Sequence, residues 1–107
     1  MIMKNGLIIE GDDTKCWYEN DQLHRIDGPA IEFTNGDKYW FTNNKRHRIG
    51  APAIEKTNGT KRWYKHGRRH RVDGPAVEHP NGYKEWWING VKLICFSQEE
   101  FEKLIKL

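Results

Sequence analysis

The chain repeats one unit of 23 residues, and this period restricts the fold more than any other feature. Trp17, Trp40, Trp63 and Trp86 mark the period. A histidine, a proline and an Asn-Gly pair recur at the same step: His24, His47, His70; Pro29, Pro52, Pro75; Asn35-Gly36, Asn58-Gly59, Asn81-Gly82. A constant period of roughly 20 to 50 residues is typical of stacked supersecondary units that bury their apolar faces against their neighbours. The period therefore predicts a scaffold with a binding surface, and not a catalytic pocket.

Each complete unit contains three short runs separated by two turn signals. A proline stands at the head of the first run, where its missing N–H does least harm to a β-ladder. The Asn-Gly pair after this run predicts a two-residue type I′ hairpin turn, with positive φ at both residues. Such a turn fixes the register of the first hairpin, with the cross-strand pairs Ala30–Phe41, Ile31–Trp40, Phe33–Lys38, Ile54–Trp63, Val77–Trp86 and an unfavourable Glu78–Glu85.

The second turn signal falls at Asn43-Asn44, His66-Gly67 and Asn89-Gly90, which are residue types that tolerate left-handed backbone. This turn would pair the third run with the tryptophan run, with the partners Trp40–His47, Phe41–Arg46, Tyr64–Arg69 and Trp87–Lys92. Because side chains alternate along a strand, Ile31, Trp40 and His47 are then expected on one face. The tryptophans are interpreted as the repeated core. Glu55 is interpreted as a cross-strand ion pair with Arg62 and Arg71.

Both ends of the repeat array carry altered sequence, as stacked repeats require. Ile8 should face Trp17 in a half-repeat, and Ser97-Gln98-Glu99-Glu100 is a capping-box signature before Phe101, Leu104 and Ile105 at helical spacing. A short amphipathic helix should therefore close the last edge or face. One domain, 1–107, is expected, with a half-repeat at 7–13, full repeats at 14–36, 37–59 and 60–82, a partial repeat at 83–96 and a capping helix at 97–107.

The predicted fold class is mainly β: a single elongated antiparallel meander of repeated β-hairpins with one short C-terminal α-helix. Residues 7–93, with their aromatic strand, basic-His step and closing Asn-Gly, resemble a divergent form of the MORN repeat. The His-Arg-x-Asp-Gly-Pro-Ala motif at 24–30 and 70–76 is similar to a repeat of small bacterial and bacteriophage proteins; the second copy departs from it at Gly50 and Ala51. The resemblance implies an interaction role and supplies no catalytic residues.

Charge is distributed unevenly along the chain. Residues 1–36 carry a net charge of −4, residues 37–82 carry eleven Lys and Arg against four Asp and Glu, and residues 83–107 are balanced. The basic residues fall on equivalent third runs, so they are expected side by side and mixed with aromatic rings, a surface that suits an acidic protein or nucleic acid. The same cations can equally be solvated stems that cover a thin sheet. The candidate partner-binding residues are Arg46, Arg48, Tyr64, Arg68, Arg69, Arg71, Trp87 and Lys92.

Catalytic and metal-binding patterns are not found in the sequence. It has no Gly-rich phosphate loop, and its single serine, Ser97, is placed as a helix N-cap. Equivalent histidines three strands apart would lie about 14 Å from one another, too far to share a zinc ion. Cys16 and Cys95 match no metal or redox spacing and are expected to be reduced. No enzyme activity, no cofactor and no metal site are therefore expected.

Two function classes remain. The first is a non-enzymatic protein-interaction module, an adaptor or, if phage-encoded, an inhibitor that acts on a host or defence protein through the sheet face. The second is a binder of an anionic ligand, nucleic acid or a nucleotide signal, through the basic middle repeats. No segment approaches the roughly 20 apolar residues of a membrane span, and the Met1 terminus lacks a signal-peptide profile, so a cytoplasmic location is expected, that of the host if phage-encoded.

Overall fold

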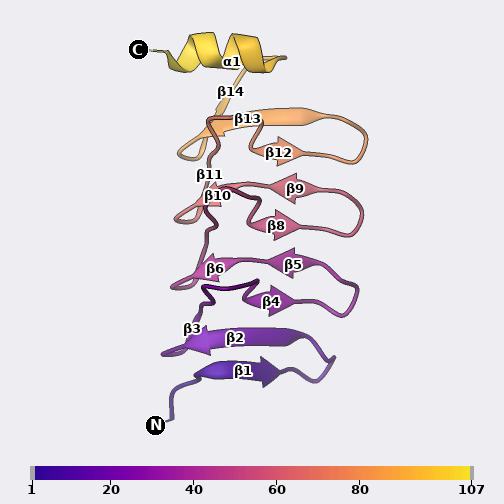
Figure 1. Cartoon of the computed structure of the whole chain (residues 1–107), viewed down its shortest axis with the longest axis vertical. Coiled ribbons are helices and arrows are strands. Elements are labelled where there is room, and N and C mark those ends of the chain that lie inside the picture. The colour runs from indigo at the N-terminus through magenta and orange to yellow at the C-terminus, as the bar shows by residue number, and fades with distance from the viewer. Residues whose placement is uncertain (1, 107) are drawn as a thin grey trace.

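The chain forms a stack of antiparallel hairpins closed by one helix (Figure 1). The structure is a computed structural model that describes residues 2–106. The stack is elongated, with extents of 50 × 29 × 19 Å. Its largest sheet has ten strands in meander order, and a single short helix lies at the C-terminal end, which confirms the predicted fold class.

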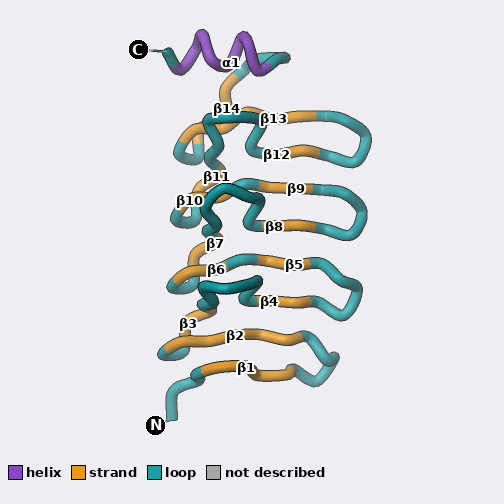
Figure 2. Tube along the Cα trace, in the orientation of Figure 1, coloured by secondary structure: helices purple, strands orange, loops and turns teal. Residues whose placement is uncertain are grey.

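The hairpins are arranged in two columns that run side by side up the stack (Figure 2). The first column contains β1 (Gly6–Ile9), β2 (Lys15–Glu19), β4 (Ile31–Glu32), β5 (Lys38–Tyr39), β8 (Ile54–Glu55), β9 (Lys61–Arg62), β12 (Val77–Glu78) and β13 (Lys84–Ile88). The second column contains β3 (Gln22–Leu23), β6 (Phe41–Thr42), β7 (Lys45–Arg46), β10 (Tyr64–Lys65), β11 (Arg68–Arg69) and β14 (Val91–Leu93). The C-terminal parts of the longer strands β2 and β13 extend into this column, where they pair with β3 and β14. Helix α1 spans Gln98–Ile105.

Backbone hydrogen bonds between repeats hold the second column together. The Asn44 N–H donates to Leu23 O (2.9 Å), and the Gly67 N–H donates to Arg46 O (2.8 Å). The same bond recurs one repeat later, from the Gly90 N–H to Arg69 O (2.9 Å). Each repeat therefore adds one hairpin to each column and satisfies the backbone groups of the repeat before it.

The first turn of each repeat differs from the sequence prediction. Gly36, Gly59 and Gly82 have positive φ (+97°, +99° and +89°), but the asparagines before them do not, so the prediction of positive φ at both residues is wrong. The Phe33 N–H donates to Asp37 O, which leaves a three-residue loop that ends in a left-handed glycine. The asparagine turns its side chain inward instead: Asn35 Oδ1 accepts from the Asp37 N–H at 2.9 Å.

This longer loop shifts the register of the first hairpin by one residue. Ile31 opposes Tyr39, Ile54 opposes Arg62 and Val77 opposes Glu85, so the predicted pairs of Ile31, Ile54 and Val77 with tryptophans are wrong. A shift of one residue moves side chains to the other face of a sheet. Tryptophan therefore shares its face with the charged residues, and Ile31 lies on the opposite face from Trp40 and His47.

The same shift removes the predicted repulsion between Glu78 and Glu85. Glu78 opposes Lys84 on one side and Lys61 on the other. Glu55 forms its ion pair with Arg48 at 2.9 Å, and not with Arg62 or Arg71. Lysine and glutamate alternate across the whole first column, in the order Lys15, Glu32, Lys38, Glu55, Lys61, Glu78, Lys84. Cross-strand neighbours of opposite charge favour this register.

The second turn follows the prediction. Positive φ occurs at Asn43 and Asn44 (49° and 68°), as a two-residue type I′ turn requires. The predicted pairs Phe41–Arg46, Tyr64–Arg69 and Trp87–Lys92 are confirmed.

Small residues, and not the tryptophans alone, form the buried centre. Ala30, Ala53 and Ala76 are fully buried, and the carbonyl of each accepts from a tryptophan N–H on the neighbouring strand (Trp17, Trp40 and Trp63). One cluster contains Ala53, Ile54 and Tyr64, with Tyr39 and Trp40 packed against it. Among the four repeated tryptophans only Trp86 is buried. The interpretation of the tryptophans as core is therefore correct only in part.

The two ends are closed differently. At the N-terminal end Ile8 opposes Cys16, and Leu7 opposes Trp17, so the half-repeat exists but the predicted Ile8–Trp17 pair is wrong by one residue. At the C-terminal end Ser97 Oγ accepts from the Glu100 N–H at 3.1 Å and caps α1 as predicted. Phe101 of α1 is fully buried in a second cluster with Trp86 and Cys95.

The first turn allows a direct test of its geometry. Gly59→Val should lower the free energy of unfolding by about 1–2 kcal/mol, because a β-branched residue is strained at φ +99°. Asn58→Val should cost less, about 0.5–1 kcal/mol, because it removes only the bond from the Thr60 N–H to Asn58 Oδ1 (2.9 Å). Urea unfolding of the two variants measures both effects. Equal losses would indicate positive φ at both positions and contradict the three-residue loop.

Candidate interaction surfaces

An alternating row of aromatic and cationic side chains crosses the second column on one face of the sheet. We call this row the cation–aromatic ladder; its members are Phe41, Arg46, Tyr64, Arg69, Trp87 and Lys92. The Arg46 guanidinium lies 5.9 Å from the Phe41 ring centroid and 5.6 Å from that of Tyr64. The Arg69 guanidinium lies 4.9 Å from the Trp87 ring, and its Nε donates to Tyr64 Oη at 3.3 Å. The ladder thus joins three successive hairpins.

The two ends of the ladder are more accessible than its centre. Arg46 and Lys92 are exposed, whereas Tyr64 is buried. Lys92 lies near Tyr83 Oη (3.4 Å) and Glu85 (3.9 Å). Burial alone would raise the pKa of Glu85, but hydrogen bonds from Trp87 and His79, together with the Lys92 charge, lower it below its usual value. Glu85 is therefore ionised at neutral pH and offsets part of the positive charge at this end.

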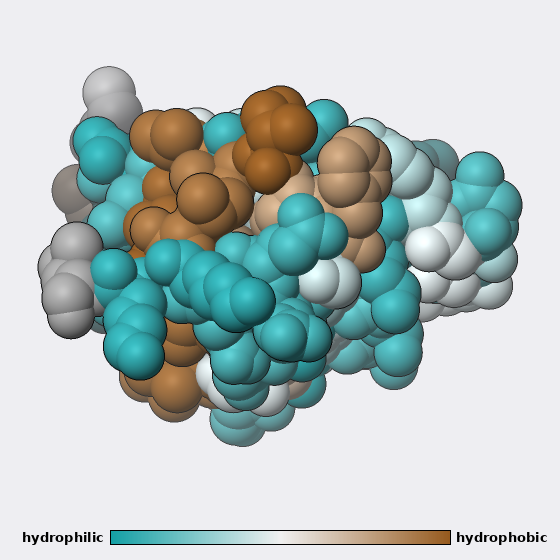
Figure 3. All heavy atoms as spheres, turned by 90° about the horizontal axis from the view of Figure 1, so that it is seen from above, coloured by the Kyte–Doolittle hydropathy of each residue, from teal (hydrophilic) through white to brown (hydrophobic). Residues whose placement is uncertain are grey.

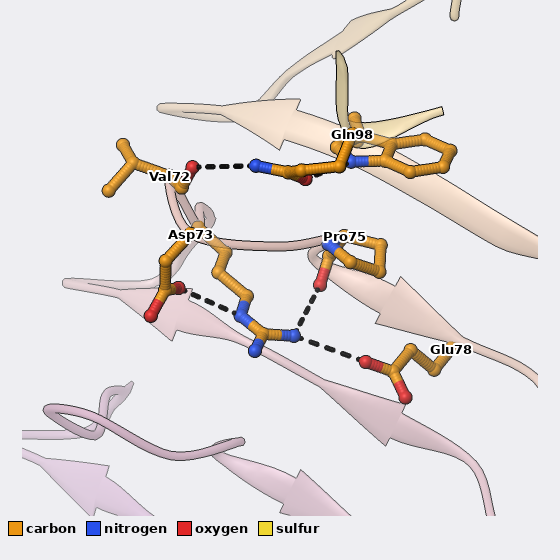
Figure 4. Close-up of polar contacts among 7 residues, drawn as sticks. Val72, Asp73, Pro75, Glu78 and Gln98 are labelled. Carbon is orange, nitrogen blue, oxygen red and sulfur yellow. Dashed lines mark hydrogen bonds and ion pairs between the residues drawn. The ribbon is translucent and has the colours of Figure 1, made fainter. Parts of the chain in front are cut away.

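The opposite face carries a second set of arginines, which support the repeat itself. Arg25, Arg48 and Arg71 each lie over the tryptophan of their own repeat, with the guanidinium carbon 3.7–3.8 Å from the ring centroid. Each donates to the carbonyl of the proline four residues later, at 3.0–3.1 Å. For the last of them, Figure 4 shows further bonds to Asp73 (3.0 Å) and Glu78 (3.1 Å). These contacts explain why the repeat keeps an arginine, an acidic residue and a proline in fixed spacing.

We call this second face the loop face, because the segments 24–30, 47–53 and 70–76 cross in front of the strands there (Figure 2). We call the face with the ladder the flat face. The predicted partner-binding residues divide between the two. Five lie on the flat face in the ladder (Arg46, Tyr64, Arg69, Trp87, Lys92), and three lie on the loop face (Arg48, Arg68, Arg71). The sequence therefore predicted one continuous basic surface where the fold makes two.

The repeated histidines connect one repeat to the next. His24 Nδ1 accepts from the Asn43 N–H (3.1 Å), His47 Nδ1 from the His66 N–H (2.9 Å) and His70 Nδ1 from the Asn89 N–H (3.0 Å). Each bond satisfies the first residue of the following type I′ turn. Within residues 2–106, no three His, Cys, Asp or Glu side chains are grouped as a metal site would require.

These histidine bonds predict a pH dependence. Burial lowers the pKa of His47 and His70, because it disfavours the charged imidazolium, and nearby positive charge (His66 and Lys65 for His47, Lys65 for His70) lowers it further. The unfolded chain therefore binds protons first as the pH falls. Stability is then full above about pH 6.5 and is lost as the pH falls below that value toward the lower folded-state pKa. Thermal melting from pH 8 to pH 5 should show this loss. It should be smaller in His70→Asn, which lacks the titrating group.

Two grooves lie between successive loops on the loop face, and the sequence did not indicate them. The groove between the first and second loops has a volume of about 700 Å³ and contains Ile26, Trp40 and His47 in its lining. The groove between the second and third loops has a volume of about 680 Å³ and contains Ile49, Trp63 and His70 at the equivalent positions. The sequence signal that could have indicated the grooves is the aliphatic residue after each His-Arg pair. This residue is exposed, so its apolar character is not explained by burial in a strand.

The C-terminal end of the stack exposes a group of large apolar side chains. Figure 3 looks onto this end and shows apolar side chains gathered on one side of a largely polar surface. Ile94 and Phe96 are 79% and 85% exposed, and Val91 and Leu104 are exposed to a lesser degree. A shallow hollow of about 360 Å³ lies beside them. This end also carries the edge strand β14.

Cys16 and Cys95 lie in the buried layers at opposite ends of the stack. Burial raises the pKa of both thiols, so each is a protonated, weakly nucleophilic group at neutral pH. Of the helices within residues 2–106, none is long and apolar enough to cross a bilayer. Neither observation assigns an activity.

Comparison with known proteins does not assign a function to the chain. No protein-family model, no curated protein and no solved structure matches the chain. The similarity to MORN repeats thus stays a prediction from the sequence motifs. The cation–aromatic ladder and the two grooves are the features from which function has to be argued.

Proposed function

We propose that this chain is a non-enzymatic, MORN-like interaction module that binds an acidic protein surface through the flat face. The single observation that supports this most is the cation–aromatic ladder, whose cations and rings alternate over three hairpins without taking part in the repeated arginine–tryptophan packing. Arginine and aromatic residues are enriched at protein interfaces. An adaptor or an inhibitor of a host or defence protein, acting in the host cytoplasm if the chain is phage-encoded, would use such a face.

Charge distribution also favours an acidic partner. Phe41, Arg46, Tyr64 and Arg69 of the ladder lie within the segment 37–82, where the chain is most basic, whereas Trp87 and Lys92 lie in the balanced segment 83–107. Guanidinium groups held over rings lose less side-chain entropy when they pair with carboxylates than free arginines do. The flat face therefore offers positive groups that are already oriented for binding.

Nucleic acid is the second candidate, and the geometry favours it less. A single strand binds through bases that stack on accessible aromatic faces. Here Tyr64 is buried, and the Phe41 and Trp87 rings already have arginines over them. The basic charge could still hold phosphates, and such binding would weaken steeply with added salt.

Neighbouring residues on the same strands provide a matched test. Arg46→Glu with Arg69→Glu reverses two charges on the flat face, while Lys45→Glu with Arg68→Glu reverses two charges one residue earlier, on the loop face. We expect the first pair to reduce capture of the partner from a lysate by at least tenfold, and the second pair to leave capture largely unchanged. Melting temperatures of both variants check that each is folded.

The result separates the alternatives. Capture that survives in the Arg46/Arg69 variant, with the protein folded, would contradict the flat face as the binding site. Loss only in the Lys45/Arg68 variant would move the site to the loop face. Capture of nucleic acid instead of protein, with strong salt dependence, would support the anionic-ligand alternative.

A further inference from the structure

Strand β1 forms the N-terminal edge of the largest sheet, and within residues 2–106 no strand lies on its outer side (Figure 1). In an antiparallel ladder, hydrogen-bonded pairs alternate with pairs whose backbone groups point away from each other. Leu7 and Trp17 form a pair of the second kind, because the Trp17 N–H donates to Ala30 O on the far side of β2. The N–H and C=O groups of Leu7, and those of Ile9 two residues later, therefore point to the free side of β1.

The side chains of β1 differ from those of the equivalent strands at the same two positions. Leu7 stands where the full repeats have Ala30, Ala53 and Ala76, and Ile9 stands where they have Glu32, Glu55 and Glu78. The alternation of lysine and glutamate across the first column therefore ends at Ile9, which opposes Lys15. Leu7 and Ile9 are 49% and 58% exposed. Free edges are commonly protected from association by charged side chains, and β1 has lost the repeated charge at its edge.

The charges that flank β1 indicate which strand could cover this edge. Lys4 precedes β1, and its backbone is held in place because Lys4 O accepts from the Asp21 N–H at 2.9 Å. An acidic turn with Glu10, Asp12 and Asp13 follows β1. A second copy of β1, paired antiparallel, would bring the acidic turn of each copy to the Lys4 end of the other. A parallel copy would place the two acidic turns together, so β1 complements itself in the antiparallel orientation.

The backbone groups at the edge also select a register. If Leu7 of each copy opposes Ile9 of the other, all four outward N–H groups meet outward C=O groups. The same register gathers the four exposed side chains of Leu7 and Ile9 on one face of the joined sheet, since residues two apart on a strand share a face. A register with Leu7 opposite Leu7 would place Ile9 opposite the polar Asn5 and cover less apolar surface.

The shape of the stack favours a closed pair. The C-terminal end is covered by α1, whose Phe101 is packed against Trp86, so it does not present a free strand equivalent to β1 (Figure 1). A contact between β1 strands uses the same surface on both copies and closes after two. The cross-section of the stack, 29 × 19 Å, limits such an end-to-end contact to about 550 Å² per copy, near the lower limit for a specific interface.

We propose that the N-terminal edge is a self-association site, at which two copies of the chain pair antiparallel through β1, with Leu7 of each copy opposite Ile9 of the other. The pairing joins two stacks into one continuous sheet and leaves the cation–aromatic ladders of both copies on the same face. The contact lies at the end of the stack, so it does not depend on the proposed function of the flat face.

The test follows the association of the full chain and of two matched variants by sedimentation velocity. The wild-type chain should be a monomer at about 5 µM and mostly a dimer at about 500 µM, as expected for a small interface with a Kd of about 10–100 µM. Ile9→Glu restores the residue of the full repeats opposite Lys15, so it should keep the fold and weaken the dimer at least tenfold. Melting temperatures check that the fold is kept.

Val91→Lys is the matched control at the other end of the stack. Val91 is 61% exposed on the edge strand β14, and lysine or arginine stands at the equivalent positions, Lys45 and Arg68. This variant should dimerise as the wild type does. In the wild type, the amide protons of Leu7 and Ile9 should exchange several-fold more slowly at about 500 µM than at about 5 µM, because they are bonded only in the dimer.

Three results would overturn the proposal. The first is a wild-type chain that stays monomeric at about 500 µM, near the weak end of specific association. The second is a dimer that Val91→Lys weakens and Ile9→Glu does not, which would place the contact at the C-terminal end. The third is association weakened by both variants and continuing beyond the dimer, which would indicate head-to-tail stacking.

Discussion

Trp63→Ala should lower the free energy of unfolding by about 3 kcal/mol, toward the lower end of the range for a large aromatic residue because Trp63 is only half-buried. The indole supports the Arg71 guanidinium at 3.8 Å, and Arg71 in turn holds Pro75 O and Glu78. Removal of the ring leaves Arg71, and with it the third loop, without the aromatic ring against which the guanidinium packs. Because Trp63 lies in the middle of a stack in which each repeat contacts only its neighbours, the loss should also reduce cooperativity. Urea unfolding followed by circular dichroism measures both effects.

A double-mutant cycle shows how much of this loss belongs to the stacked pair. Arg71→Ala, Trp63→Ala and the combined variant should give a coupling free energy of about 0.5–2 kcal/mol, as expected for a cation held over an aromatic ring. Arg69→Ala is the matched control, because Arg69 lies on the flat face and does not contact Trp63. A coupling between Trp63 and Arg71 near zero would contradict the assignment of the loop-face arginines to repeat packing.

The sequence predicted the period, the fold class and the second turn, because each depends on local residue types. Asn43-Asn44 and its equivalents have few alternatives to a type I′ turn, and Phe41–Arg46 follows from it. Asn35-Gly36 is compatible with two turns, one with both residues at positive φ and one with the glycine alone. The choice depends on the Asn35 side chain, which accepts from the Asp37 N–H. The register error in the first column follows from this one turn.

Only part of the candidate site could be predicted, because the face on which each side chain lies also depends on the register. A register shift of one residue moves a side chain to the other face, so the basic residues on the third runs could not all be placed from the pattern. Arg46 and Arg69 face the aromatic rings as predicted, because the second turn sets their register. Arg48 and Arg71 follow the end of the strand, where the chain folds back over its own tryptophan. Strand alternation does not describe that segment.

The grooves could not be predicted from the motif alone. Their walls come from loops of different repeats, which the sequence pattern alone does not bring together. Gln98 has no counterpart among the earlier repeats, since Pro52 and Pro75 stand at the equivalent positions. Its contacts with Trp86 and Val72 are therefore visible only in the folded chain.

Helix α1 should be as important to the C-terminal repeat as Trp63 is to the centre. Phe101 is fully buried against Trp86 and Cys95, with the two aromatic ring centroids 6.5 Å apart. Phe101→Ala should cost about 3–5 kcal/mol, because the cavity lies in the centre of the apolar cluster that holds the helix to the stack, beside the smaller contacts of Ile105 and Gln98. A loss of this size exceeds the stability expected of a single short helix on its own.

The helix should therefore detach from the last repeat before the remaining hairpins unfold. Limited proteolysis should cut the Phe101→Ala variant first within 97–105, at a urea concentration where the rest of the stack resists, and the Trp86 indole N–H should exchange faster with solvent. Leu104→Ala is the matched control, since Leu104 is on the same helix but 58% exposed, and should change stability by less than about 1 kcal/mol. Equal effects of the two substitutions would mean that α1 does not hold Trp86 through Phe101, and the last repeat would then have to be stabilised by its own strands, β13 and β14.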